Sequence, residues 1–121
     1  MSPIIKEAPI LLKDVNFYST KAELLPVSFP ELNRLVKLMK EYPTMEIEIH
    51  GHTESTPGYE QKLMELSKKR AETVKLYLVY KGIKSTRIQK KAFGGTKPIA
   101  GNNTEQGRKK NRRVEFRVIK K

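Results

Sequence analysis

The sequence of 121 residues contains no cysteine and only two histidines. Without cysteine the chain has no thiol nucleophile, no thiolate metal ligand and no disulfide, so these three kinds of chemistry are excluded. No apolar run approaches the roughly 18 residues that span a bilayer, and the first residues do not resemble a signal peptide. The length suits one compact domain, and we expect a soluble one.

Acidic residues are scarce in the second half of the chain. Residues 1–60 carry six Lys+Arg and nine Asp+Glu, whereas residues 61–121 carry nineteen and four. The formal net charge is +12. This asymmetry predicts an anionic partner, which can be nucleic acid, a membrane surface or another acidic polymer. Charge alone does not choose among the three.

Hydrophobic periodicity predicts elements in the order β-α-β-α-β-β, with a short helical turn before the last strand. The predicted elements are a strand at 11–17, a helix from the capping box Ser28–Glu31 to Tyr42, a strand at 45–50, a helix at 60–81, a strand at 87–93, a turn at 104–107 and a strand at 114–118. The first helix has a core stripe at Leu32, Leu35, Val36 and Met39. The second strand alternates apolar and polar residues, which predicts burial on one face.

Arg70 interrupts the apolar stripe of the second helix. On a helical wheel it lies between Leu66 and Val74, with Leu63 and Tyr77 close to the same line. A lone cation is disfavoured there unless it is paired. One interpretation is that its stem packs on the sheet while the guanidinium reaches an edge. The other is a guanidinium held at a pocket, in position to bind a carboxylate through two hydrogen bonds.

Glu54 leaves the strand that most plausibly neighbours this helix. It can be the structural partner of Arg70, or it can accept a ligand ammonium beside Arg70. A cation and an anion on adjoining walls suit a zwitterion such as an amino acid. This pair is the strongest indication of small-molecule recognition in the chain.

His50, His52 and Glu54 alternate along one extended segment, a spacing that can hold a divalent metal. Gly51 and the loop after it make continued alternation doubtful, and no fourth ligand is evident. We therefore favour a histidine packed at the strand end and bonded to a loop, and we expect no metal site and no cofactor.

The run Arg108–Arg113 is rich in cations and resembles a phosphate-binding patch, although such runs are usually solvated surface. Support for nucleic-acid binding is missing, because the aromatic residues Phe17, Phe93 and Phe116 occupy core-like strand positions. The chain also lacks a nucleophile elbow, a phosphate loop, an HExxH motif and a convincing carboxylate pair. We expect neither an enzyme nor a nucleic-acid-binding protein.

Several motifs together are similar to the OmpA-like C-terminal domain, the OmpA/MotB peptidoglycan-binding family. They are Ile47-Glu-Ile-His-Gly-His-Thr-Glu54, Leu66-Ser-Lys-Lys-Arg-Ala71, Phe93-Gly-Gly-Thr-Lys-Pro-Ile-Ala100, Asn103-Thr-Glu-Gln-Gly-Arg108 and Asn111-Arg-Arg-Val-Glu115. The resemblance covers nearly the whole chain, from Val15 to Val118. It implies an α+β fold, an α/β sandwich in which two main helices cover one face of a mixed sheet of about four strands.

The resemblance also implies a function. Domains of this family bind peptidoglycan in the periplasm of Gram-negative bacteria and anchor an outer-membrane protein, a lipoprotein or a flagellar stator to the cell wall. Their ligand is the diaminopimelate of the stem peptide, whose end carries an amine and a carboxylate. In the family, two residues hold that end: an acidic residue after Gly-His-Thr and the Arg of Leu-Ser-x-x-Arg-Ala. The matching positions in this sequence are Glu54 and Arg70. Further implied binding residues are Thr53, Ser19, Thr20 and Arg112.

The side chain of Asn111 is expected to fix a loop by hydrogen-bonding the backbone of that loop. Arg113 is expected to be a surface or structural cation. Two positions depart from the family pattern: Glu54 stands where the family usually has Asp, and Leu63 stands where it usually has Asn. We expect diaminopimelate binding to be retained. Residues 1–9 are expected to be an N-terminal extension, and residues 10–121 are expected to form the domain.

Two hypotheses compete with peptidoglycan binding. One is a basic nucleic-acid or anionic-surface module, and the other is a structural envelope docking domain with a vestigial pocket. Other envelope or secretion-complex proteins are further expected partners.

Overall fold

The structure, a computed structural model, describes residues 8–121. Its strands are β1 (Ile10–Leu11), β2 (Glu46–His52), β3 (Ile88–Gly94) and β4 (Arg113–Lys120). Its helices are α1 (Phe29–Glu41), α2 (Glu60–Tyr80) and α3 (Glu105–Asn111), with short 3-10 turns η1 (Pro26–Ser28) and η2 (Ser85–Arg87). Most of the extension expected at residues 1–9 lies outside the described residues. Within the described part, no helix is both long and apolar enough to cross a bilayer.

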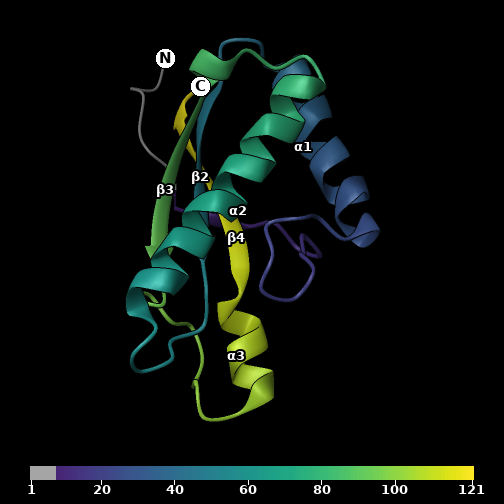
Figure 1. Cartoon of the computed structure of the whole chain (residues 1–121). Helices are drawn as coiled ribbons and strands as arrows, with labels where there is room; N and C mark the ends of the chain where they lie inside the picture. Colours follow the sequence, from purple (N-terminus) through teal and green to yellow (C-terminus); the bar gives the residue numbers. More distant parts are fainter. Residues whose placement is uncertain (1–7) are drawn as a thin grey trace.

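The four strands form one mixed sheet in the order β1-β4-β2-β3. β2 pairs with β3 in parallel and with β4 antiparallel, so it is one of the two inner strands of the sheet. Figure 1 shows α2 running across the sheet, with α1 beside it. The predicted α+β fold is confirmed, and so is the core stripe of α1, whose Leu32, Leu35, Val36 and Met39 are all buried.

β2 is buried on both faces, whereas its sequence predicted burial on one. Ile47 and Ile49 face the helices, and at Gly51 the backbone of α2 comes so close that an added Cβ would clash with the Ser67 carbonyl oxygen. The opposite face carries Glu48, His50 and His52, which are buried as well. Ion pairs with β3 and β4 make that polar face tolerable inside the protein.

The predicted first strand is wrong in extent, because only Ile10 and Leu11 pair with β4. Asp14 adopts a left-handed backbone with φ of 65°, which ends the extended segment. Phe17 then forms an isolated bridge with Leu24, so residues 16–25 make a narrow loop over α2. That loop, rather than a longer strand, becomes one wall of the site described below.

Two helix starts differ from the sequence prediction. Ser28 does not form the expected capping box, because its hydroxyl bonds the backbone N–H and C=O of Asn16 while Glu31 accepts from the backbone of Lys13. The predicted turn at 104–107 is a two-turn helix, α3, whose start is capped by the Thr104 hydroxyl accepting from Gly107 N–H. Most of the basic run is therefore helical and continues directly into β4.

Candidate functional site: a charged cavity between the loop 16–25, α2 and α3

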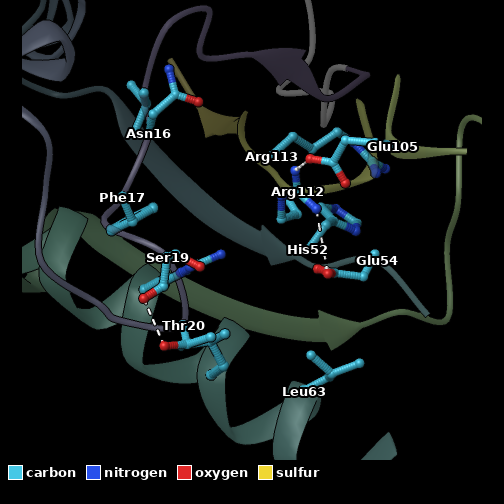
Figure 2. Close-up of a pocket in the computed structure, with 13 residues that line it drawn as sticks. Asn16, Phe17, Ser19, Thr20, His52, Glu54, Leu63, Glu105, Arg112 and Arg113 are labelled. Atoms are coloured by element: carbon cyan, nitrogen blue, oxygen red, sulfur yellow. Dashed lines mark hydrogen bonds and ion pairs between the residues drawn. The ribbon is translucent and has the colours of Figure 1, made fainter. Parts of the chain in front are cut away.

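A cavity of about 440 Å³ opens where β2 ends, beside the N-terminal half of α2. Its walls come from loop 16–25, from the residues after β2, from α2, and from α3 with the start of β4 (Figure 2). The lining residues are Val15, Asn16, Phe17, Ser19, Thr20, His52, Glu54, Leu63, Leu66, Arg70, Glu105, Arg112 and Arg113. Segments that are far apart in the sequence thus come together around one charged cavity.

Arg70 is a buried cation in the wall of this cavity, with 6% of its surface exposed. Its Nε donates to the Lys21 carbonyl at 2.8 Å, and its guanidinium carbon lies 4.9 Å from the centre of the Phe17 ring. A weaker contact of 3.5 Å joins Nη2 to the Tyr18 carbonyl. Burial lowers the pKa of Arg70, against the opposing effect of the Glu54 charge. Because guanidinium has five N–H donors, these contacts leave donors for a ligand carboxylate.

Glu54 pairs with Arg112 rather than with Arg70. Its Oε2 lies 3.4 Å from Arg112 Nη1, while Arg112 Nη2 donates to Glu105 Oε2 at 2.6 Å (Figure 2). Burial opposes the charge on Arg112, but its hydrogen bond to Glu105 and the charge of Glu54 raise its pKa. The contact of Glu54 is long and uses one carboxylate oxygen, so the other oxygen remains available to a ligand ammonium. Among residues 8–121 the ion pair of Glu54 is with Arg112, and Glu54 acts on Arg70 through its charge, which opposes the lowering of the Arg70 pKa by burial.

The remaining predicted binding residues divide into two groups. Ser19 and Thr20 line the cavity from loop 16–25, where Thr20 has a left-handed φ of 59°. Thr53 is buried outside the cavity lining, and its hydroxyl donates to the Glu54 carbonyl at 2.8 Å. The side-chain amide of Asn111 bonds Ile99 N–H and both backbone groups of Ala100. Thr53 and Asn111 therefore position neighbours of the cavity.

Of the two histidines of β2, His50 hydrogen-bonds the Glu48 carboxylate and not the loop that the sequence suggested. His52 lines the cavity and lies near the Glu115 carboxylate without a hydrogen bond to it. His50 Nε2 lies 3.0 Å from Glu48, and His52 Nε2 lies 3.3 Å from Glu115. Among residues 8–121, His50, His52 and Glu115 are the three side chains whose ligand atoms cluster within 4.8 Å, so Glu54 is not part of the set. Arg117 pairs with Glu48 and Arg113 with Glu115, and these positive charges oppose a divalent cation there.

Sequence reasoning missed several lining residues. The sequence pattern places Phe17 in a core strand, whereas in the structure its ring packs against the Arg70 guanidinium. Glu105 lies at the start of α3, where acidic residues often serve only the helix dipole, so the local pattern gave no sign of its bond to Arg112. Arg113 proves structural: its Nε bonds Glu115 and its Nη2 the Lys97 carbonyl. Non-local pairing of this kind leaves no periodic signal in a single sequence.

Comparison with known proteins identifies the family. The model of the OmpA family matches residues 16–112, which include all the residues that line the cavity except Val15 and Arg113. The chain belongs to the OmpA family. It is 40% identical over 107 residues to outer membrane porin F of Pseudomonas fluorescens, covering 87% of this chain and 32% of that protein. It is 38% identical over 104 residues to the peptidoglycan-binding protein ArfA of Mycobacterium tuberculosis, covering 86% of this chain and 32% of ArfA.

Solved structures share this fold. The crystal structure of the periplasmic domain of Helicobacter pylori MotB superimposes with a TM-score of 0.77 at 24% identity, covering 93% of this chain and 72% of that one. This OmpA-family chain spans about a third of the length of the two curated relatives above. The family relationship therefore concerns one domain, and not the remaining parts of those longer proteins.

Proposed function

We propose that this OmpA-family domain binds peptidoglycan non-covalently and thereby anchors an outer-membrane or envelope-complex protein to the cell wall in the periplasm. The ligand is the zwitterionic end of diaminopimelate in the stem peptide. The observation that carries the proposal is Arg70, a buried guanidinium in a cavity wall whose described contacts are carbonyl oxygens and an aromatic ring. The relative ArfA, named as peptidoglycan-binding, supports the same class of ligand.

In the proposed complex, Arg70 pairs with the ligand carboxylate and Glu54 with the ligand ammonium. Burial strengthens the first contact, because the guanidinium is already removed from bulk water and loses little solvation on binding. Arg112 lies beside Glu54 and limits how much negative charge faces the ligand. Glu105 in turn holds Arg112 in place from α3. Glu54 and Leu63, the two positions that depart from the family pattern, both line the cavity.

The test is co-sedimentation of the domain with purified sacculi. Arg70→Ala should abolish binding, and Glu54→Gln should weaken it, because a charged contact in a half-buried site contributes roughly 1.5–3 kcal/mol. Circular dichroism and urea unfolding establish that each variant is folded. Arg34→Ala is the matched control, since Arg34 is a largely exposed arginine on α1. Full binding by folded Arg70→Ala would overturn the proposed site.

The competing proposal, a basic nucleic-acid or anionic-surface module, fits the structure less well. Three of the five cations in 108–113 already have partners, since Arg108 bonds Glu105 and the Asn102 carbonyl, Arg112 bonds Glu54 and Glu105, and Arg113 bonds Glu115. Lys109 and Lys110 are exposed. Two exposed lysines on a short helix are a small footprint for a polyanion.

A further inference from the structure

A second groove runs alongside the cavity and shares part of its wall. The groove has a volume of about 680 Å³ and lies between loop residues 20–22, the segment before α2, and one side of α2. Thr20, Leu63 and Leu66 line both the cavity and the groove. A chain that enters the cavity can therefore continue along the surface into the groove.

The groove combines an apolar floor with a positively charged rim. Ala22, Leu63 and Leu66 provide the apolar lining. Three exposed lysines also line it, Lys21 from the loop and Lys62 and Lys69 from α2, against the single acidic residue Glu65. Cations on both sides of an apolar floor suit an extended chain that carries a carboxylate.

The same arginine that lines the cavity also fixes the loop wall of the groove. Arg70 Nε donates to the Lys21 carbonyl at 2.8 Å, and the Thr73 hydroxyl donates to the Ala22 carbonyl at 2.8 Å. These bonds from α2 hold residues 21 and 22 in one position relative to the helix. The two walls of the groove are thus preorganised, which reduces the entropy lost when a ligand binds.

We propose that this groove, defined by Lys21, Lys62, Lys69 and the apolar residues between them, binds the part of the stem peptide that precedes diaminopimelate. The recognised group is the free α-carboxylate of the glutamate in that peptide. This glutamate is linked through its side-chain carboxyl, so its α-carboxylate remains an anion one residue from the zwitterionic end. The inference rests on the proposed function, because it places diaminopimelate itself in the cavity.

The test compares three ligands by isothermal titration calorimetry: free meso-diaminopimelate, the tripeptide L-Ala-γ-D-Glu-meso-diaminopimelate, and the same tripeptide with the glutamate α-carboxylate converted to an amide. The variant is Lys62→Ala/Lys69→Ala. We expect it to bind the acidic tripeptide about fivefold more weakly than wild type, the size expected for losing two exposed ion pairs. Its affinity for the amidated tripeptide and for free diaminopimelate should be unchanged.

The control is Lys68→Ala/Lys110→Ala, which removes the same charge from exposed positions outside the groove. It should bind all three ligands as wild type does. An equal loss for the acidic and amidated tripeptides, or an equal loss in the control, would overturn the groove proposal while leaving the cavity proposal standing. Failure of the wild type to bind any of the three ligands would instead contradict the proposed function.

Discussion

At the residue scale, His52 is a histidine whose neutral form is built into the fold. Its side chain is 2% exposed and stacks on Phe93, with ring centroids 5.0 Å apart. Burial, followed by the positive charge of Arg113, lowers the pKa of His52 to about 4, although Glu115 acts in the opposite direction and His50 reinforces the lowering. The folded protein therefore resists protonation at this position.

This predicts that the domain loses stability as the pH falls below about 6.5. The unfolded chain binds a proton at His52 near its ordinary pKa of 6.5, whereas the folded chain does so only near 4. The contribution is therefore complete above pH 6.5 and disappears as the pH falls towards 4. Between pH 7.5 and 5 it amounts to about 2 kcal/mol. Urea unfolding at both values should show this loss, and His52→Gln should remove most of it; an unchanged loss in that variant would exclude His52 as the cause.

Arg70 could be singled out from sequence because a charge in an apolar helical stripe is a local anomaly. Its partners could not be found in the same way. The Lys21 carbonyl is 49 residues away along the chain, and the contact between Glu54 and Arg112 spans 58 residues. Such pairings depend on how loop 16–25 and α3 pack around the end of β2, which no local pattern encodes.

At the element scale, the site depends on the close packing of β2 against α2, because β2 leads to Glu54 and α2 carries Arg70. Gly51 makes that packing possible: a Cβ there would meet the backbone of Ser67. The Ser67 hydroxyl also accepts from Gly94 N–H at 3.0 Å and so ties α2 to β3. Because the atoms that this Cβ would meet belong to the backbone of α2, they cannot rotate away as a flexible side chain would.

Gly51→Ala should therefore destabilise the domain by about 1–3 kcal/mol through overpacking. By moving α2 away from β2, it should also weaken binding to sacculi, since Arg70 and Glu54 would no longer lie on opposite sides of one cavity. Gly58→Ala is the comparison, because the added Cβ at residue 58 meets open space. Its effect on stability reports only the cost of placing alanine at the left-handed φ of 88°. Thermal unfolding and co-sedimentation of both variants check this. A smaller effect at Gly51 than at Gly58 would contradict the packing argument.

Regular elements were the part of the fold that the sequence predicted well. The four-residue stripe of α1, the stop of α2 before Gly82 and the positions of β2 and β4 follow from the sequence pattern. The errors fall where side chains bond backbone outside the regular elements. Ser28 bonds Asn16 in place of capping α1, and Asp14 turns the chain out of the sheet.

At the scale of the whole molecule, the net charge of +12 is divided between structural ion pairs and exposed lysines. Arg117 and Arg113 neutralise carboxylates on the face of the sheet away from the helices. Arg87 binds the carbonyls of Met39, Tyr42 and Met45, and so holds the end of α1 against β2. The arginines are thus largely used within the fold, and the exposed lysines contribute a diffuse positive field.

A diffuse field and a discrete site respond differently to salt. Ligand binding through Arg70 and Glu54 involves two charged contacts in a partly buried cavity, where screening is weak. We therefore expect the affinity for free diaminopimelate to fall no more than a few-fold between 50 and 200 mM salt. Binding to a polyanion through six to ten phosphate contacts would instead fall by about 10³–10⁵. Titrating diaminopimelate and a DNA duplex at both salt concentrations separates the two modes. Tight DNA binding with a steep salt dependence, together with no binding of diaminopimelate, would show that the exposed lysines and not the cavity determine the partner.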